Sequence, residues 1–190
     1  MYKESIDKDE LMELPLIQFE GEISLVESKE DYLASIEYLS RQSLLGFDTE
    51  TKPAFKKGVY NEVALLQLAT EDRAFLFRLN KIGLGNSLKR ILENPEIKKI
   101  GVAIRDDIKG LQKLNNFTPG GFVELQDRVK DYGIQDFSLK KISAIVLGQR
   151  ISKSQRVTNW EAPDLTEAQQ IYAATDAWVS HRIYQSLNEQ

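Results

Sequence analysis

The sequence predicts a one-domain α/β protein with a mixed sheet flanked by helices, and three observations support this prediction. Strand-like segments come first as a cluster, and strands and helices then alternate along the chain. Two of the strands are joined by a short polar turn and must therefore run antiparallel. The chain has 190 residues, of which 42% are hydrophobic, and this is enough to build one buried core.

The segments expected to form strands are apolar and rich in β-branched or aromatic residues, and polar turns bound them. The residues Thr70–Arg73 supply the hairpin turn between the third and fourth strands. The expected strands are residues 21–28, 44–50, 63–70, 73–79, 98–104 and 120–126.

The segments expected to form helices have apolar residues at helical spacing and recognisable ends. Ser28 is a candidate N-cap and Gly148 a candidate C-cap. Thr166 and Gln169 have the spacing of a capping box, which predicts where the last helix begins. The expected helices are residues 28–42, 84–94, 106–114, 137–148 and 165–187.

Residues 1–20 are polar, and we expect them to form an irregular, loosely held N-terminal arm before a domain of residues 21–190. The sequence has no cysteine, which excludes disulfides and thiolate metal sites. Neither a secretory signal pattern nor an apolar run of membrane-spanning length occurs in the sequence. We therefore expect a soluble intracellular, cytoplasmic protein that does not bind a membrane.

The net charge is −4 and the isoelectric point is about 5.2. These values argue against a passive coat for nucleic acid, because such proteins are normally basic. They allow an enzyme whose metal ions neutralise an acidic centre. The single histidine, His181, excludes metal sites built from several histidines, and a histidine general base would have to be this residue.

Asp48 and Glu50 lie two residues apart on the expected strand 44–50, so their side chains point to the same face. Two carboxylates on one face repel each other unless a cation lies between them. The alternative is that the strand ends at Phe47 and that water solvates both acids. An acid pair with this spacing is common, so it is weak evidence when taken alone.

Asp106 and Asp107 open the helix that follows the strand 98–104. Asp107 lies beside the apolar stripe, three residues after Ile104 and four before Leu111. Asp106 shares the polar face with Lys109. We therefore expect Asp107 to point inward, although both acids would also be favourable N-terminal charges of a helix and nothing more.

Asp176 interrupts the apolar stripe of the last expected helix. An acid in a core stripe needs a partner, and Tyr172 projects from the same face one helical turn earlier. One interpretation is a buried tyrosine–aspartate contact that fixes packing. The other places Asp176 on a metal ion, with Tyr172 holding an attacking water. The stripe consists of Tyr172, Val179, Ile183 and Leu187.

Taken together, these acids come from three distant segments, and each lies where a core-facing residue is expected. Buried carboxylates without a cation are costly, so the cluster suggests bound divalent metal. Divalent metal held by carboxylates in turn suggests phosphoryl chemistry.

The order of the motifs resembles that of the DEDDy group of 3′–5′ exonucleases, of the RNase D and Werner-syndrome exonuclease type. The resemblance runs from Leu44 to Leu187 and extends to the sequences around the acids, which read VALLQLAT, KKIGVAIRDD and TNWEAPDLTEAQQIYAATDAWVSHRIY. The resemblance implies an RNase H-like mixed sheet flanked by helices. In the related histidine-containing group a histidine stands five residues before the last aspartate, where this chain has Ile171.

The resemblance also implies a reaction: hydrolysis of phosphodiester bonds from the single-stranded 3′ ends of DNA or RNA, releasing nucleoside 5′-monophosphates. Tyr172 would orient the attacking water and help to deprotonate it. Four carboxylates would hold two divalent ions, Mg²⁺ or Mn²⁺: Asp48, Glu50, Asp107 and Asp176.

Contacts to the nucleic acid are expected from basic and aromatic residues outside the acidic centre. Lys153 and Arg156, in the polar loop before the last helix, are the favoured phosphate contacts. Trp160 or Phe55 could stack on a base, although a tryptophan is more often a core anchor. The other candidates are Lys56 and Lys57, which follow the first motif, and Thr49, which lies between the first two acids.

Two other functions remain open at this point. A non-catalytic nucleic-acid-binding or scaffold module could use the same fold, although the complete set of acids argues against it. An RNase H-like enzyme that cuts internally would leave the pair of Tyr172 and Asp176 without a role. The sequence does not distinguish DNA from RNA as the substrate.

Overall fold

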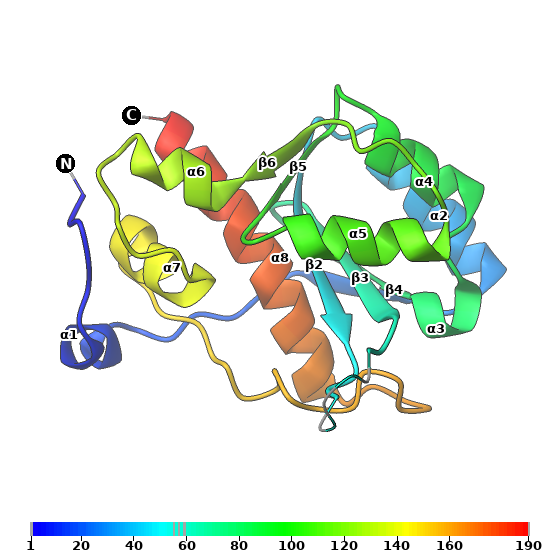
Figure 1. Ribbon diagram of the computed structural model, residues 1–190, viewed down its shortest axis with the longest axis horizontal. Helices are drawn as coiled ribbons and strands as arrows, with labels where there is room; N and C mark the ends of the chain where they lie inside the picture. The colour runs from blue at the N-terminus through cyan, green and yellow to red at the C-terminus, as the bar shows by residue number, and fades with distance from the viewer. Residues whose placement is uncertain (1, 55, 57, 59, 190) are drawn as a thin grey trace.

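The computed structural model describes residues 2–54, 56, 58 and 60–189, and its centre is a six-stranded sheet with the order β1-β4-β3-β2-β5-β6 (Figure 1). The strands are β1 (Glu22–Val26), β2 (Leu44–Thr51), β3 (Val63–Ala69), β4 (Arg73–Arg78), β5 (Lys98–Gly101) and β6 (Phe122–Glu124). All six expected strands are present, and β2 and β3 lie in the middle of the sheet.

The sheet is mixed, as predicted. The consecutive strands β2, β3 and β4 pair antiparallel, whereas β1 pairs with β4, β5 with β2 and β6 with β5 in parallel. The hairpin between β3 and β4 requires the antiparallel pairing, and the parallel pairs need longer connections, most of which contain helices. Strand β2 is hydrogen-bonded on both sides, which makes it a rigid support for the acids at its end.

The helices are α1 (Lys8–Glu13), α2 (Lys29–Leu39), α3 (Leu79–Ile82), α4 (Asn86–Glu93), α5 (Arg105–Leu114), α6 (Leu125–Lys130), α7 (Leu139–Leu147) and α8 (Glu167–Asn188). The predicted caps are confirmed. Ser28 caps α2, Gly148 adopts the left-handed conformation that ends α7, and Thr166 and Gln169 form a capping box on α8. The short helices α1, α3 and α6 were not expected, because segments of four to six residues show too little periodicity.

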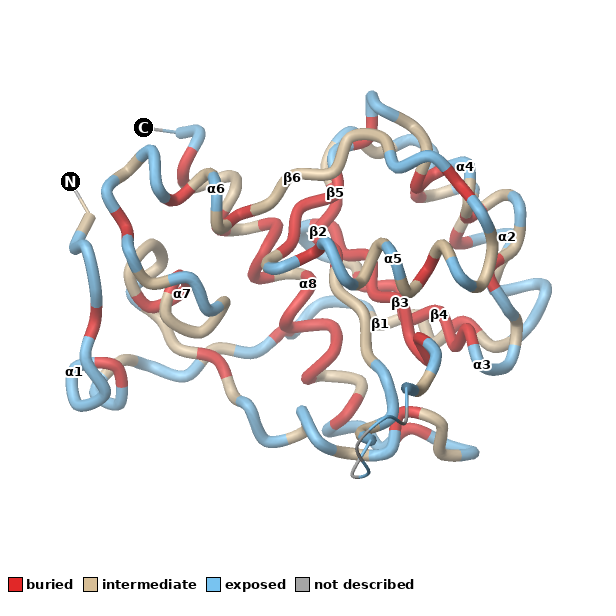
Figure 2. Tube along the Cα trace, in the orientation of Figure 1, coloured by how far each residue is buried: buried red, intermediate tan, exposed pale blue. Residues whose placement is uncertain are grey.

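Helices cover both faces of the sheet (Figure 1). One face packs against α2, α4 and α5, and the other face packs against the long helix α8, with α6 and α7 beside it. Figure 2 shows that buried residues concentrate in the strands and along α8. Among the helices of the described residues, none combines the length and apolar character needed to cross a membrane.

The N-terminal arm differs in part from the sequence-based expectation, because residues 2–20 are largely irregular but include a short helix and are attached to the rest of the fold. Residues 8–13 form α1, and Leu11 is buried against Ala144 of α7. The amide of Ile17 donates to the carbonyl of Arg150 at 2.9 Å, and the amide of Phe19 donates to Thr175 Oγ1 at 2.9 Å. A few apolar residues within the polar arm are enough to attach it to α7 and α8.

Strand β2 approaches α8 closely at Gly46. A Cβ atom added to Gly46 would lie 1.8 Å from the carbonyl oxygen of Ala177, so only glycine fits there. Alternation along the strand places Gly46, Asp48 and Glu50 on the α8 side, and Phe47 in the opposite core. The missing side chain at residue 46 therefore lets α8 lie directly on the strand that carries the two acids.

We predict that Gly46→Ala lowers the free energy of unfolding by about 1–3 kcal/mol, because the added methyl group must push α8 away from β2. Urea denaturation followed by tryptophan fluorescence measures the change. Ser43→Ala, at an exposed position just before β2, is the matched control and should unfold like the wild type. Equal stability of the two variants would contradict the close approach.

Candidate active site

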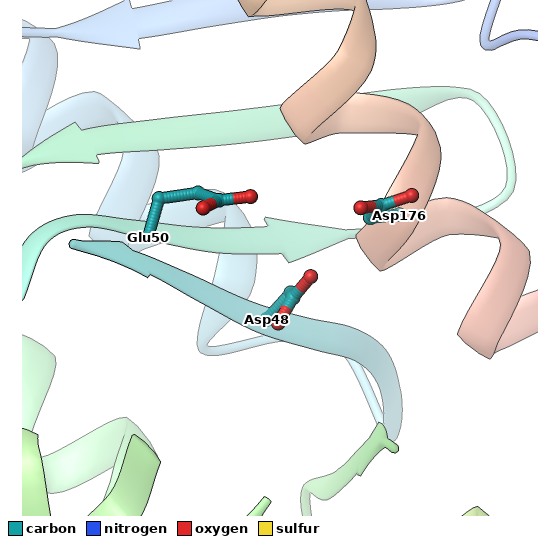
Figure 3. A group of neighbouring side chains, drawn as sticks. All are labelled: Asp48, Glu50 and Asp176. Atoms are coloured by element: carbon teal, nitrogen blue, oxygen red, sulfur yellow. The ribbon is translucent and has the colours of Figure 1, made fainter. Parts of the chain in front are cut away.

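Three carboxylates converge where β2 meets α8 (Figure 3). Asp48 and Glu50 project from the same face of β2, and Asp176 projects toward them from α8. Each offers an oxygen atom, and these three atoms lie within 4.8 Å of one another. Asp176 is buried, and the two acids of β2 are partly buried. The interpretation that water solvates both acids beyond the end of the strand is wrong, because β2 continues to Thr51.

Burial and mutual repulsion make these three groups difficult to ionise. Burial raises the pKa of Asp48 well above its usual range, and the charges of Asp176, Glu50 and Asp107 add to the rise. Burial, together with Asp176 and Asp107, raises the pKa of Glu50 to about 8. Burial raises the pKa of Asp176 to about 7, although a hydrogen bond with Tyr172 and the charge of Lys153 oppose this rise. A cation within the group would keep all three ionised near neutral pH.

The three carboxylates fit a hard divalent cation. All the ligand atoms are carboxylate oxygens, which Mg²⁺, Mn²⁺ and Ca²⁺ prefer over nitrogen or sulfur. Asp176 is nine-tenths buried, and clustering acids at such a place is unfavourable without a counter-charge. This acidic group is therefore suited to bind metal.

Asp107 lies next to this group but on the other side of β2. The hydroxyl of Thr49 donates a hydrogen bond to Asp107 Oδ1, and Thr49 points away from Asp48 and Glu50 because side chains alternate along a strand. Burial raises the pKa of Asp107, and the bond from Thr49 opposes the rise. The predicted helix faces are confirmed, since the side chain of Asp106 is 93% exposed and pairs with Lys109 at 3.3 Å.

Tyr172 lies one turn before Asp176 on α8, as predicted, and its ring packs against Trp160 with the centroids 6.1 Å apart. Burial, with the charges of Asp176 and Glu50, raises the pKa of Tyr172 above its usual range. The hydroxyl is therefore protonated at neutral pH and able to donate a hydrogen bond at the edge of the carboxylate group.

Two of the predicted nucleic-acid contacts lie close to the acids. The positive charge of Arg156 lowers the pKa of Glu50, and that of Lys153 lowers the pKa of Asp176. Both basic side chains are exposed in the loop before α8. Lys56 is exposed as well, but among the described residues its charge is not one of those that shift the pKa values of the three acids. Phe55 and Lys57 lie outside the described residues.

The expectation that Trp160 stacks on a base is wrong for this structure. Its side chain is fully buried in the core between β3, β4 and α8, where it packs against Tyr172. The indole packs against the ring of Tyr172 and has no exposed face on which a nucleotide could stack. Thr49 also differs from a simple substrate contact, because its hydroxyl is already bonded to Asp107.

Two features near the acids were not found from the sequence. Gln67 lies opposite Asp48 on β3 and faces α8, and among the described residues its buried amide has no hydrogen-bond partner. A lone glutamine within the apolar strand sequence VALLQLAT was the available signal.

The second feature is a cavity of about 250 Å³ lined by Tyr172, Asp176 and the arm residues Leu16, Ile17 and Gln18. Nothing in the arm's sequence indicated that it would reach α8.

Comparison with known proteins places these observations in a family. The sequence model described as 3′–5′ exonuclease matches residues 23–190. The chain is 35% identical over 184 residues to the bifunctional 3′–5′ exonuclease/ATP-dependent helicase WRN of Mus musculus, covering 92% of this chain and 13% of that protein. It is 29% identical over 168 residues to the ribonuclease D of Gluconacetobacter diazotrophicus, covering 87% of this chain and 42% of that protein.

The structure is also similar to the crystal structure of the Aedes aegypti Nibbler EXO domain, with a TM-score of 0.81, 26% identity and coverage of 91% of both chains. This likeness confirms the expected RNase H-like fold. The chain spans less than half the length of these two curated relatives.

For the metal-free protein, we predict that the free energy of unfolding falls as the pH rises from about 4 to about 8. The pKa values of Glu50 and Asp176 are raised on folding, so their protonated forms stabilise the folded state, and this contribution is lost as the pH passes about 7 to 8. Asp176→Asn removes one of the repelling charges. The variant should therefore exceed the wild type in stability by about 1–3 kcal/mol at pH 8 and by less at pH 4.

Urea denaturation in the presence of a chelator measures this difference, with Asp106→Asn as the control for loss of an exposed charge. Addition of Mn²⁺ should reverse the order by stabilising the wild type more than Asp176→Asn. A constant difference between the two proteins from pH 4 to pH 8 would contradict the mutual repulsion of the acids.

Proposed function

Because the chain belongs to the 3′–5′ exonuclease family, we propose that it hydrolyses phosphodiester bonds from the 3′ end of single-stranded DNA or RNA and releases nucleoside 5′-monophosphates. The observation that carries the proposal is the convergence of Asp48, Glu50 and Asp176 within 4.8 Å. Residues 21–190 are proposed as the exonuclease domain, which agrees with the matched range 23–190, and residues 1–20 as an arm attached to it. A cytoplasmic location is also proposed and is compatible with a chain that has no cysteine.

We propose that two divalent ions, Mg²⁺ or Mn²⁺, are held by Asp48, Glu50, Asp107 and Asp176. When bound, such ions lower the pKa of an attacking water and stabilise the charge on the leaving 3′-oxygen. The protein contributes a rigid arrangement, since β2 fixes Asp48 and Glu50 on one side and Thr49 holds Asp107 on the other. The bond from Thr49 orients one oxygen of Asp107.

Tyr172 is proposed to orient the attacking water. Its raised pKa keeps the hydroxyl protonated, so it acts as a hydrogen-bond partner for the water, and proton removal falls to the ionised carboxylates. Trp160 holds the tyrosine ring in place through their packing contact. Tyr172 and Asp176 both line the adjoining cavity, which gives the water a place to enter.

Lys153 and Arg156 are proposed to bind the phosphates of the nucleic acid, with Lys56 as a further contact. The charges of Lys153 and Arg156 already act on the site, since Lys153 lowers the pKa of Asp176 and Arg156 lowers that of Glu50. Basic residues of this kind give an affinity that falls with salt concentration. They also compensate for the overall charge of −4, which would otherwise repel a polyanion.

The proposal is tested with 5′-labelled single-stranded DNA and RNA oligonucleotides incubated with Mg²⁺ or Mn²⁺ and resolved on a sequencing gel. We expect a ladder that shortens from the 3′ end, is abolished by EDTA and is lost in Asp176→Ala. Asp107→Ala should lower the rate by at least about 100-fold, whereas Asp106→Ala, its matched neighbour, should stay close to the wild type.

Internal fragments would point to an internally cutting enzyme, and binding without cleavage would point to a non-catalytic module. An inactive Asp106→Ala protein beside an active Asp107→Ala protein would contradict the roles assigned to the two helix faces.

We predict that Tyr172→Phe lowers kcat by about 100-fold, because the ring still packs on Trp160 while the hydroxyl is lost. Mn²⁺ affinity, measured by calorimetry, and the unfolding temperature should change little. Tyr184→Phe, on the same helix and bonded to Lys98, is the control and should retain full activity. If Tyr172→Phe proves unfolded, the hydroxyl has a packing role and the assignment fails.

A further inference from the structure

The junction between β5 and α5 is held by one side chain, that of Glu124 at the end of β6. Its two carboxylate oxygens accept hydrogen bonds from the amide of Ala103 at 2.9 Å and from the amide of Ile104 at 2.9 Å. The same carboxylate accepts a third bond at 3.1 Å, from the amide of Gln126 in the first turn of α6. One charged group therefore joins the start of α6 to the backbone immediately before α5.

Ala103 needs such an anchor because its φ angle is +59°, in the left-handed region. It is the one non-glycine residue with a positive φ angle in the described part of the chain. This conformation is strained for an alanine, because its Cβ atom comes too close to the following carbonyl oxygen. Strand β5 was expected to continue to Ile104 but ends at Gly101, because the backbone turns here to meet Glu124.

The turn at residues 102–104 determines where Asp107 lies. Helix α5 begins at Arg105, so Asp107 is in its first turn and three residues after the anchored Ile104. Asp107 is held a second time, through the hydroxyl of Thr49 on β2. Glu124 is close enough for its charge to contribute to the raised pKa of Asp107. Two anchors on different strands thus define the position of this carboxylate.

We propose that Glu124 is a positioning residue for Asp107: by binding the amides of Ala103 and Ile104, its carboxylate fixes the turn that delivers Asp107 to the metal site. The inference rests on the proposed function, because Asp107 is assigned there as a metal ligand. Glu124 itself is bonded to backbone amides and acts only through Asp107. Substitution of a residue that holds a metal ligand in place typically lowers metal affinity or activity by about 10–100-fold.

A simpler role for Glu124 is that of a cap for α6, since it occupies the N-cap position of that helix. Loss of a cap lowers stability but gives no reason for metal binding to change. The two roles therefore differ in whether Mn²⁺ affinity changes in a protein that remains folded.

The experiment compares Glu124→Gln with Asp127→Asn. Asp127 lies three residues after Glu124 and carries an exposed carboxylate, so the control changes the net charge equally at a nearby position. In Glu124→Gln one of the two acceptor oxygens becomes an NH2 group, which can only donate, so the amides of Ala103 and Ile104 no longer each meet an acceptor oxygen of their own. Glu124→Asp is the second variant, because it keeps the charge but is one methylene too short to bridge Ala103 and Ile104.

Three measurements follow. In the metal-free protein, hydrogen exchange of residues 101–108 should be faster in Glu124→Gln than in the wild type and in Asp127→Asn. Calorimetry should show Mn²⁺ affinity reduced by about 10–100-fold. On the labelled oligonucleotide, kcat should fall by a similar factor while KM stays constant. Adding Ala103→Gly to Glu124→Gln should recover part of the lost affinity, since glycine adopts positive φ at no steric cost.

Unchanged Mn²⁺ affinity in folded Glu124→Gln or Glu124→Asp would overturn the proposal and leave Glu124 as a helix cap. Failure of both variants to fold would also overturn it, by showing a structural role. If the wild type does not degrade the oligonucleotide, the proposed function fails, but hydrogen exchange and Mn²⁺ affinity still decide whether Glu124 positions Asp107.

Discussion

The mutual repulsion of Asp48, Glu50 and Asp176 is the constraint to which the rest of this fold is adapted. Three carboxylates held within 4.8 Å of one another destabilise the folded chain, as their raised pKa values indicate. Their positions persist because the supporting elements are fixed independently of them. Strand β2 is hydrogen-bonded to β3 and β5 at the middle of the sheet, and α8 is anchored along its length by two hydrophobic clusters. Stored electrostatic repulsion of this kind makes the site selective for a cation.

The approach of α8 to β2 depends on small residues at the contact. Gly46 has no side chain, and the face of α8 that packs against the sheet carries alanines, so the two backbones meet where larger residues would keep them apart. The backbone contact at Ala177 lies one residue from Asp176. The distance between the carboxylates is therefore determined by backbone contact, which is stiffer than contact through flexible side chains. Larger apolar residues, including Trp160 and Leu165, belong to the same cluster as these alanines.

Much of this organisation could be predicted from the sequence, because the strands and long helices have strong periodic patterns and standard caps. The inward orientations of Asp107 and Asp176 followed from their places in apolar stripes. The arm could not be predicted in the same way, since its attachment depends on isolated contacts such as that between Leu11 and Ala144. For Trp160 the sequence allowed both a base-stacking and a core role, because a tryptophan in a polar loop looks the same in sequence whether it faces solvent or core; the structure shows the core role.

The acids near β2 lie on both sides of this strand. Asp48 and Glu50 face α8 and Asp176, whereas the intervening Thr49 faces α5 and binds Asp107. Regular pairing of β2 with β3 shifts register between Glu50 and Thr51, immediately after the last acid of the strand. Irregularities of this kind commonly lie beside active sites, where they redirect a side chain or end the pairing. The acids therefore occupy the last regular part of β2, where the sheet is still rigid.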